Sequence, residues 1–465
     1  MDSESAGSDA VKCFAIFGYP YFQLYYFCPM ILPWSEIKNY LFRATFTFRA
    51  LRSRNYAIYI MGMLVSVLGT WIQIIATGWL VYRLTNSAYM LGVVTFAGQI
   101  PSIIVTPFAG VYADRINRRK VILGTQISAM ILSLILALLV LSDNIDVWHI
   151  ILLSVLSGVV NAVDTPFRHA FIRDLVENQS QMSNAIALNS MLFNTARFVG
   201  PMVGGILIAL IGEGWCFMIN AISFLAVIVS LFVIHTTFHP KESNDKTILQ
   251  DLKEGIRYSF GFIPIRYMLI LIISTGFFIL PFQSFLPVFA KDVLSGDSSL
   301  YGALTGFYGA GALIGAMFLA SRKSLKKFPQ YILIAAFLFS GALAVFSYSG
   351  STALSMFLLL ICGWAMIAQY VSVNTLLQTI SHPEMVGRVI SFYGMSFMTV
   401  TPLGALLIGK LTKFLSIQDV FFAFSCLSLV AAVLFYVKKN AIVSEVKKNL
   451  CHPAKNNESD LDELK

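Results

Sequence analysis

Long apolar runs separated by short polar breaks make up most of the chain from Tyr56 onward. The runs are 17 to 27 residues long, and a helix needs about 20 mainly apolar residues to cross a bilayer. The pattern therefore predicts twelve membrane-spanning helices, in two sets of six. Their approximate ranges are 57–81, 90–113, 121–141, 147–163, 185–211, 215–234, 268–290, 302–320, 330–348, 353–373, 389–411 and 420–437.

Short motifs recur between the two sets of helices. A segment that begins at Gly92 has a weaker copy at Gly302, and Gly200-Pro201 is echoed by Thr401-Pro402. Parallel repeats around a central pathway are an architecture of secondary transporters. The predicted fold class is therefore an all-α integral membrane protein, in which two pseudo-symmetric six-helix bundles arise by duplication.

The polar segments set the predicted domain boundaries. The two bundles cover residues 55–235 and 267–437, and residues 236–266 form a cytoplasmic linker between them. Residues 438–465 form a charged cytoplasmic tail. Residues 1–54 are expected to be a cytoplasmic extension, which is either a flap on the membrane surface or a product of a start site upstream of the true one.

Composition and charge exclude an ordinary soluble domain. The chain has 57% hydrophobic and only 12% charged residues, whereas soluble domains have about a quarter charged. Of the 33 Lys and Arg, 28 fall in segments on one side of the predicted membrane and four on the other. Because Lys and Arg are retained in cytoplasmic loops, both termini are predicted to be cytoplasmic, in a multi-pass protein of the cell inner (plasma) membrane.

This topology accounts for the net charge of +9 without a nucleic-acid partner. The six cysteines are scattered and form no CxxC pair, which favours small core residues over metal ligands. The sequence has no Walker-type phosphate-binding motif. We therefore predict no metal, no other cofactor, no direct use of ATP and no enzymatic activity, in a protein that works as a monomer.

A charged motif occupies the loop between the second and third predicted helices. Its defining residues are Gly110, Asp114, Arg115, Arg118 and Arg119. They resemble the G-x-x-x-D-R-x-x-R-R/K signature that the major facilitator superfamily carries at this loop.

The physical roles expected of the loop motif follow from its residue types. Gly110 is expected to let the second helix approach a neighbour closely, and Asp114 to accept hydrogen bonds at the N-terminus of a partner helix. The resemblance implies that this partner is the eleventh helix, which begins near Arg388. We also expect Asp164 and Arg168, after the fourth helix, to form a gate pair with this loop.

The fifth predicted helix contains the small-residue motif Gly200, Pro201, Gly204 and Gly205. It resembles a signature of antiporters and exporters in the superfamily, with Ala196 in place of the first glycine. Such a run makes a flat, kinked helix face that permits close packing and hinge motion. Residues 48–410 further resemble the branch that includes enterobactin exporters and macrolide efflux proteins, which implies export of small organic molecules.

Arg197 is the only basic residue well inside a predicted helix, about 18 Å along the fifth. A charge at this depth indicates function by default. Arg197 either faces the pathway and attracts an anionic substrate, or is satisfied by carbonyls and by Asn189 or Asn194 and only holds the helix in place. No Asp or Glu lies at comparable depth in the predicted helices, and the fourth helix lacks the arginine usual in the superfamily.

The resemblance also implies that the first, fourth, seventh and tenth helices line the pathway. Their candidate polar residues are Gln73, Thr77, Asn161, Gln283, Gln369 and Asn374. The predicted function is secondary active export of a small organic molecule, a siderophore or drug-like compound, by alternating access with proton antiport. The alternative is a lipid or lysolipid transporter of the same fold.

Overall fold

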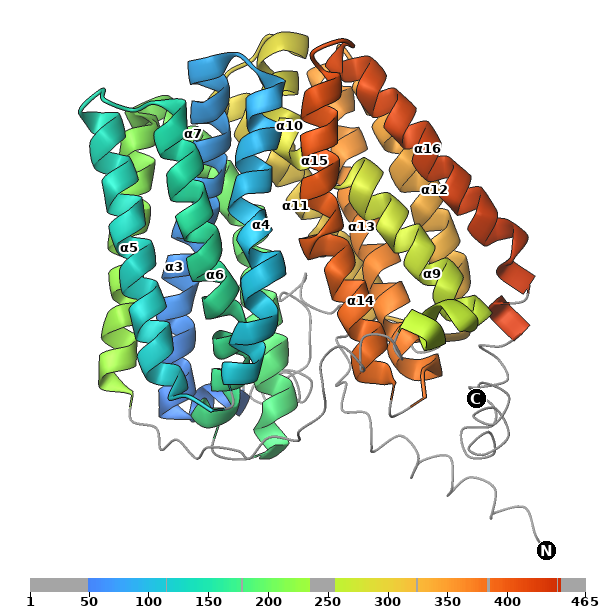
Figure 1. Cartoon of the computed structure of the whole chain (residues 1–465), viewed down its shortest axis with the longest axis horizontal. Coiled ribbons are helices and arrows are strands. Elements are labelled where there is room, and N and C mark those ends of the chain that lie inside the picture. Colours follow the sequence, from blue (N-terminus) through green and yellow to red (C-terminus); the bar gives the residue numbers. More distant parts are fainter. Residues whose placement is uncertain are drawn as a thin grey trace, which may run out of the picture.

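Helices account for almost all of the chain that the structure describes. The computed structural model describes residues 49–113, 115–176, 179–234, 256–322, 325–382, 385–440 and 442–444. Figure 1 shows two helical bundles side by side, the N-terminal half in blue to lime and the C-terminal half in yellow to red. We call the end that carries residues 86–87 the outer end, following the charge pattern, and the opposite end the inner end.

The N-terminal half contains five long helical elements. They are α3 (Arg54–Thr85), α4 (Ala88–Tyr112), α5 (Arg118–Leu141), α6 (Val147–Leu175) and α7 (Gln179–Val233), preceded by the short turn η2 (Arg49–Arg52). Within α7, Gly212 has a φ of +81° and a ψ of 168°, which are not helical. Glycine adopts a positive φ readily because it lacks a Cβ atom, so the chain bends here, between the fifth and sixth predicted helices.

The C-terminal half is less regular. Its elements are α9 (Ile263–Ser274), η3 (Thr275–Ile279), α10 (Phe282–Val288), η4 (Phe289–Val293), α11 (Ser298–Ala320), η5 (Leu325–Lys327), α12 (Phe328–Ser347), α13 (Thr352–Ile380), α14 (Val386–Met398), α15 (Val400–Leu411) and α16 (Ile417–Val437). The seventh predicted helix is thus a composite of α9, α10 and the π-helical turns η3 and η4. Pro281 and Pro287 lie in this stretch, and proline cannot donate to the regular helical hydrogen-bond ladder.

Eleven of the described helices are long and apolar enough to cross a membrane. One of them, Asn184–Val233, has 50 residues and would extend about 75 Å as a single helix, against a hydrocarbon core of about 30 Å. The break at Gly212 divides this element into two stretches of crossing length. The predicted count of twelve spanning helices depends on that division.

The fourth predicted helix is longer than the sequence indicates. α6 runs from Val147 through Leu175 instead of ending at residue 163, so Asp164 and Arg168 lie inside it. Asp164 is about 26 Å along this helix from its outer end, within the thickness of a hydrocarbon core. The expectations that no carboxylate lies at depth in a helix and that this helix lacks an arginine are therefore wrong.

The apolar core joins the two halves only toward the outer end. One cluster of buried residues combines the outer parts of the N-terminal helices, such as Leu80 and Val81, with C-terminal residues such as Leu286 and Tyr301. A second cluster, which includes Tyr59, lies in the inner part of the N-terminal half and contains no C-terminal residue among those described. In agreement, the two bundles in Figure 1 converge at the outer end and diverge toward the inner end.

Very close helix contacts at glycines join the halves, two of them near the outer end. A Cβ atom added to Gly302 on α11 would lie 2.7 Å from the Cα atom of Gly205 on α7, and one added to Gly92 on α4 would lie 2.6 Å from the carbonyl oxygen of Ala405 on α15. Gly92 and Gly302 are corresponding positions of the predicted repeats, one turn from the outer end of their helices. Equivalent glycines thus pack each half against the other.

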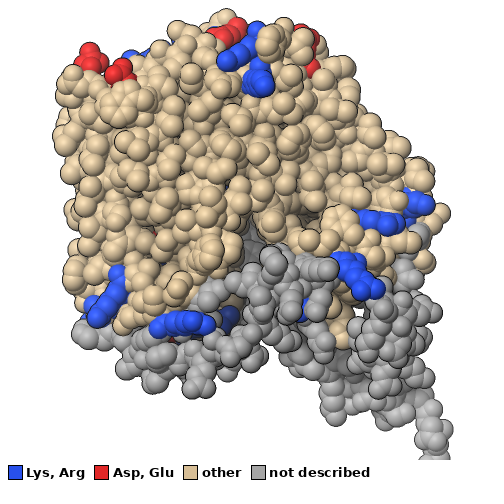
Figure 2. All heavy atoms as spheres, viewed as in Figure 1, with Lys and Arg blue, Asp and Glu red and all other residues tan. Residues whose placement is uncertain are grey.

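Charged side chains are absent from the middle of the molecular face in Figure 2. On this face the visible Asp and Glu lie at the outer end with a few Lys and Arg, and other Lys and Arg lie toward the inner end. An uncharged band between two charged margins is the surface expected of a protein that spans a bilayer.

The glycine contacts predict that any side chain at Gly302 weakens the packing between the halves. Gly302→Ala should lower the stability of the purified protein by about 1 to 3 kcal/mol, as overpacking typically does, measured as a fall in Tm in detergent. Gly341→Ala in α12 is the matched control because nothing lies within 4 Å of the added Cβ atom. Equal Tm values for both variants would contradict the assigned contact.

Candidate functional site

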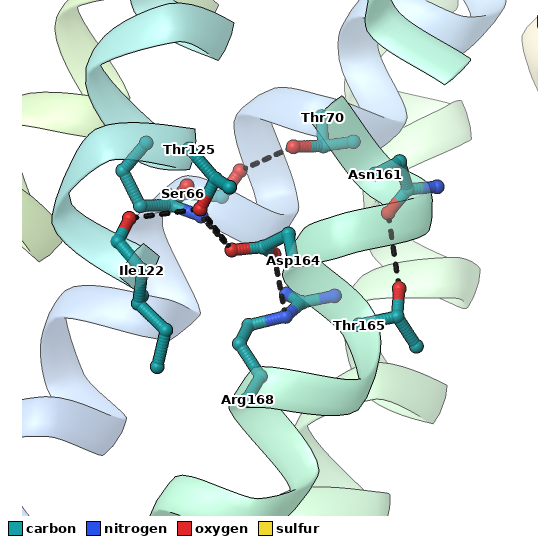
Figure 3. Close-up of polar contacts among 9 residues, drawn as sticks. Ser66, Thr70, Ile122, Thr125, Asn161, Asp164, Thr165 and Arg168 are labelled. Atoms are coloured by element: carbon teal, nitrogen blue, oxygen red, sulfur yellow. Dashed lines mark hydrogen bonds and ion pairs between the residues drawn. The ribbon is translucent and has the colours of Figure 1, made fainter. Parts of the chain in front are cut away.

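A buried ion pair lies within the N-terminal half on α6. Asp164 is 4% exposed, and its Oδ2 atom lies 2.8 Å from Nε of Arg168, one turn further along the helix. Its Oδ1 atom accepts hydrogen bonds from the Thr125 hydroxyl at 2.6 Å and from the Gln126 amide at 3.1 Å, both on α5. Figure 3 shows the carboxylate between Thr125 and Arg168, so both of its oxygens have partners.

A cavity of about 190 Å³ adjoins this ion pair. It is lined by residues of α3, α6 and α7, namely Tyr59, Met63, Thr165, Arg168, His169, Ile172, Asn189 and Phe193. The Arg168 guanidinium lies 5.3 Å from the centroid of the Phe193 ring. The hydroxyl of Tyr59 is buried and has no hydrogen-bond partner among the described residues. Asp164 and Arg168 therefore pair with each other, and Asp164 also bonds to α5, beside a cavity whose lining is mostly apolar.

Arg197 lies on the first stretch of α7 and contacts an aromatic ring. Its guanidinium is 5.5 Å from the centroid of Trp71 on α3, a cation–π geometry. The Asn194 amide donates to the Ser190 carbonyl oxygen, and Asn189 lines the cavity beside Arg168. No bond from Arg197 to either asparagine occurs in the described part of the chain, so the geometry gives no support to the expectation that they satisfy its charge.

Gln73 is held between helices of the N-terminal half. Its Oε1 atom accepts from the Ser133 hydroxyl on α5 and from the Asn220 amide on α7, both at 2.6 Å. These contacts favour a role in helix packing for Gln73. Thr77, one turn further on α3, is half-buried.

The other predicted pathway residues fall in three separate places. On α6, Asn161 is exposed and accepts a hydrogen bond from Thr165, as drawn in Figure 3. In the C-terminal half, the Gln283 amide donates to the Tyr308 hydroxyl at 3.3 Å. Also in this half, the Gln369 amide donates to the Thr275 hydroxyl at 3.0 Å, and Asn374 accepts from Gln378 at 3.0 Å.

Gln369 is fully buried, and its Oε1 atom lacks a hydrogen-bond partner among the described residues. Thr275, the residue to which its amide donates, opens the π-helical turn η3. Turns of this type occur often at functional sites.

The loop motif at the inner end binds to the N-terminal half itself. Arg118 donates from Nε to the Ala113 carbonyl oxygen and pairs through Nη1 with Asp174 of α6 at 2.7 Å. Arg119 donates to the carbonyl oxygens of Leu231 and Phe232, which lie at the C-terminal end of α7, where a cation is favourable. The pairing of Arg118 with Asp174 had no signal in the sequence because 56 residues separate the two.

The remaining residues of the loop motif and its expected partner helix differ in how they compare with the predictions. No described atom lies within 4 Å of a Cβ atom added to Gly110, so the described residues give no support to the expected close approach of a helix at this glycine. Asp114 lies outside the described residues. Arg115 is exposed, and Arg388 contacts the Met385 sulfur near the start of α14.

The small-residue motif on α7 faces two helices. A Cβ atom at Gly200 would lie 2.4 Å from Cβ of Trp71, and one at Gly204 would lie 3.3 Å from Cα of Ile72. Gly205 and the Pro201 carbonyl oxygen both lie against Gly302 of α11. The motif thus packs α7 closely against α3 and against α11 of the opposite half. Its contact with Trp71 positions the ring that Arg197 covers.

Polar side chains of both halves meet at the outer end, around a cavity of about 340 Å³. We name the following three pairs the outer seal: Tyr82 with Asp292, Asn86 with Lys291, and Tyr89 with Lys413. The Lys291 ammonium donates to Oδ1 of Asn86 at 2.7 Å, and the Lys413 ammonium lies 3.8 Å from the centroid of the Tyr89 ring. Each pair joins the N-terminal half to the C-terminal half.

A protein-family model described as a transmembrane secretion effector, MFS_3, matches residues 45–463. The chain belongs to this family of the major facilitator superfamily. The predicted superfamily is therefore confirmed, and so is the prediction of a multi-pass membrane transporter rather than an enzyme.

Curated relatives of this MFS_3 protein include efflux proteins. The staphyloferrin A transporter of Staphylococcus aureus is 27% identical over 54% of this chain, and the match spans 63% of that protein, less than two thirds of its length. The multidrug efflux pump Tap of Mycolicibacterium fortuitum is 24% identical over 79% of this chain and 91% of its own. Macrolide efflux protein A of Streptococcus pyogenes is 23% identical over 70% of this chain and 80% of its own.

Solved structures share the fold. A bacterial homologue of the human lysosomal transporter Spinster, in an inward-facing and unoccupied conformation, has a TM-score of 0.63 at 15% identity, over 85% of this chain and 98% of that one. The nucleoside transporter NupG has a TM-score of 0.62 at 14% identity, over 82% and 98%. These similarities confirm the predicted all-α transporter fold.

The pairing of Arg118 with Asp174 predicts a coupled loss of stability. Both side chains are mostly buried, at 11% and 18% exposure, so removing one partner withdraws charge compensation from the other. Arg118→Ala and Asp174→Ala should each lower Tm. The double variant should lose less than the sum of the two, measured as a double-mutant cycle.

The pair Arg83–Glu213 provides the matched control for this cycle. Its N···O distance is 2.8 Å, and Arg83 is 49% exposed although Glu213 is only 10% exposed. Because solvent screens the exposed guanidinium, this pair should couple more weakly than two mostly buried partners. Coupling at Arg118–Asp174 no larger than at Arg83–Glu213 would contradict a structural role for the loop contact.

Proposed function

We propose that this protein is a secondary active exporter, which moves a small organic molecule across the cell inner (plasma) membrane by alternating access. The observation that carries the proposal is the similarity to efflux proteins over most of the chain, including 91% of the length of the multidrug pump Tap. Siderophores and drug-like compounds are the proposed substrate classes, because the relatives include a staphyloferrin A transporter and a macrolide efflux protein.

The proposed direction of access follows from the geometry of the two halves. They share a core at the outer end and are joined there by the outer seal, while the bundles diverge toward the inner end in Figure 1. We take the inner end as cytoplasmic, with both termini on that side, because 28 of the 33 Lys and Arg were assigned to it. Substrate then enters from the cytoplasm and leaves when the outer seal opens.

Arg197 is the proposed contact for an anionic substrate group. It lies about 22.5 Å from the bend at Gly212 along α7, and its guanidinium faces the uncharged ring of Trp71. Among the described residues the guanidinium has no carboxylate partner, so it retains its attraction for an anion, which is strong where water is scarce. Proton antiport is the proposed energy source for a monomeric carrier.

Transport in inverted membrane vesicles tests the function and the role of Arg197 together. Energised vesicles that contain the protein should accumulate staphyloferrin A or a labelled macrolide above empty-vector vesicles. Arg197→Ala should reduce accumulation of an anionic substrate about tenfold or more, the loss expected for a hydrogen bond to a charged group. Arg197→Lys should retain part of it.

Two outcomes would overturn these assignments separately. Accumulation equal to that of empty vesicles for siderophore, macrolide and the cation ethidium alike would reject the exporter, and a lipid-flipping assay on the same vesicles then tests lipid cargo. Normal transport by Arg197→Ala, at the same membrane level, would leave the exporter in place and remove Arg197 from the substrate path.

Locking the outer seal should stop transport. Asn86→Cys and Lys291→Cys are joined by a short cross-linker that has two thiol-reactive ends and can be cleaved by reduction. The cross-link should fix the two halves at the outer end, because the native side chains are 2.7 Å apart. Vesicle transport should fall to background and return after reduction. The matched control is Arg83→Cys with Glu213→Cys, which cross-links within the N-terminal half; inhibition by that pair as well would contradict a specific role for the seal.

A further inference from the structure

Arg197 lies next to the opposite half of the molecule as well as over Trp71. A Cβ atom added to Gly309 on α11 would lie 2.8 Å from the Cα atom of Phe198 and 3.2 Å from the carbonyl oxygen of Arg197. The backbones of α7 and α11 therefore touch at the position of Arg197. Tyr308, the residue before Gly309, is near enough for the positive charge of Arg197 to act on its hydroxyl group.

The side chains of Arg197 and Tyr308 project on the same side of this helix contact. α7 runs toward the outer end before its bend, whereas α11 begins at the outer end, so the two helices are antiparallel. Successive residues of a helix are rotated by about 100°. Arg197 precedes the contact residue of its helix, and so does Tyr308. Because the helices run in opposite directions, these two rotations lead to the same side.

The orientation of Tyr308 is fixed by α10 of its own half. The Phe282 ring is edge-on to the Tyr308 ring, with 5.2 Å between the centroids, and the Gln283 amide donates to the Tyr308 hydroxyl at 3.3 Å. Phe282 and Gln283 are adjacent in the chain, at the start of a helix between the π-helical turns η3 and η4. One short segment thus holds both the ring and the hydroxyl oxygen of Tyr308.

The Tyr308 hydroxyl has a proton that it does not donate. Its oxygen accepts the bond from Gln283, and no described residue accepts a bond in return. Tyr308 is 1% exposed and lies about 15 Å along α11 from the outer end, half the thickness of a hydrocarbon core. Leaving a buried donor without an acceptor is unfavourable, so an acceptor supplied by a ligand would stabilise this site.

One anionic group can satisfy both of these donors. Arg197 offers guanidinium N–H groups that have no hydrogen-bond partner among the described residues, and Tyr308 offers its hydroxyl. A carboxylate accepts hydrogen bonds at each of its two oxygens, and hydrogen bonds to an ionised group are stronger than those between neutral groups. A cationic group would be repelled by Arg197, so the pair of donors favours anions over cations.

We propose that Tyr308 is a specificity-determining residue of the carrier, which binds the same anionic group of the substrate as Arg197 but from the opposite half. The substrate class that this arrangement selects is organic carboxylates. The inference deepens the proposed function and rests on it, because it assigns a chemical class to the exported molecule.

The location of the two donors suits a carrier that changes its access. When two rigid bodies tilt about a region of contact, groups beside that region move apart less than groups at the far ends. Arg197 and Tyr308 lie beside a backbone contact between the halves, whereas the outer seal lies at an end. The anion site can therefore persist while the ends of the carrier open and close.

Two dyes of opposite charge test the specificity of transport in inverted vesicles. Carboxyfluorescein carries carboxylates, and ethidium is a cation. Tyr308→Phe keeps the ring and removes only the hydroxyl, so carboxyfluorescein accumulation should fall about tenfold or more, the loss expected for a hydrogen bond to a charged group, with no change for ethidium. Tyr301→Phe is the matched control, because Tyr301 is also buried, lies on the same helix two turns nearer the outer end, and stacks on Trp79.

A charge introduced next to Tyr308 should reverse the preference. Gln283→Glu places a carboxylate where the amide now donates; this carboxylate accepts the Tyr308 proton and attracts Arg197. Carboxyfluorescein accumulation should fall to background and ethidium accumulation should rise. If Tyr308→Phe does not fold, as judged by its size-exclusion profile and Tm, Gln283→Glu decides. Equal carboxyfluorescein accumulation by wild type, Tyr308→Phe and Gln283→Glu, or equal losses of both dyes, would overturn the proposal, and so would export of ethidium or a macrolide without carboxyfluorescein.

Binding to the purified protein separates failure of the site from failure of the proposed function. Carboxyfluorescein anisotropy is titrated with protein in lipid nanodiscs, and Tyr308→Phe should raise Kd about tenfold or more. A protein that binds the dye through Tyr308 but moves no compound above empty vesicles loses the exporter assignment and retains the anion site. A protein that exports but shows the same Kd for wild type and Tyr308→Phe loses only the anion site.

Discussion

The arrangement of the molecule depends on two glycine contacts near its outer end. In lipid, helices gain no hydrophobic energy from associating with one another, so close packing must hold them together. Gly302 against Gly205, and Gly92 against Ala405, bring backbones of opposite halves within distances that no side chain would allow. Both contacts lie one turn from the outer ends of α4 and α11, and a further contact, of Gly309 on α11 with Phe198 on α7, lies about midway along α11. The halves are therefore joined over their outer part and can separate at the inner end while these contacts persist.

The charges inside the bundle are held in two different ways. Asp164 and Arg168 compensate each other, and α5 supplies the remaining hydrogen bonds to the carboxylate. Arg197 instead lies over the face of Trp71, which attracts a cation, and its hydrogen-bond donors have no partner among the described residues. The first arrangement is neutral as a whole. The second retains a net positive charge, so an incoming anion would change it.

Hydrophobic patterning located the spanning segments because every crossing must bury or lipid-expose apolar side chains. It ended the fourth helix at residue 163 because Asp164 and Arg168 resemble the start of a loop, whereas their mutual pairing lets α6 continue to Leu175. Gly110 shows a second limit of the sequence pattern. A glycine permits a close helix contact but does not create one, and among the described residues a close partner lies at Gly92 and not at Gly110.

Contacts between distant segments were the part that sequence could not supply. Tyr82 and Asp292 are separated by 210 residues and lie in different halves, and each alone has the pattern of an ordinary polar residue near a helix end. The same holds for Arg118 and Asp174. The residue types of the loop motif predicted a partner helix for Asp114, and the family resemblance pointed to the eleventh. The described arginines of the motif instead bind α6 and α7.

The distance between the ion pair on α6 and the outer seal constrains how alternating access can link the two ends of the carrier. On α3, Tyr59 beside the cavity and Tyr82 in the seal are 23 residues apart, which is about 35 Å along the helix. A local rearrangement of side chains does not extend over this distance, but a change in the tilt of packed helices does. Arg168 lies at the junction of α3, α6 and α7, and α7 carries the glycine that contacts the opposite half. A shift of this junction would therefore turn the N-terminal half about the glycine contacts, and the seal residues at the ends of α3 and α4 would move with it.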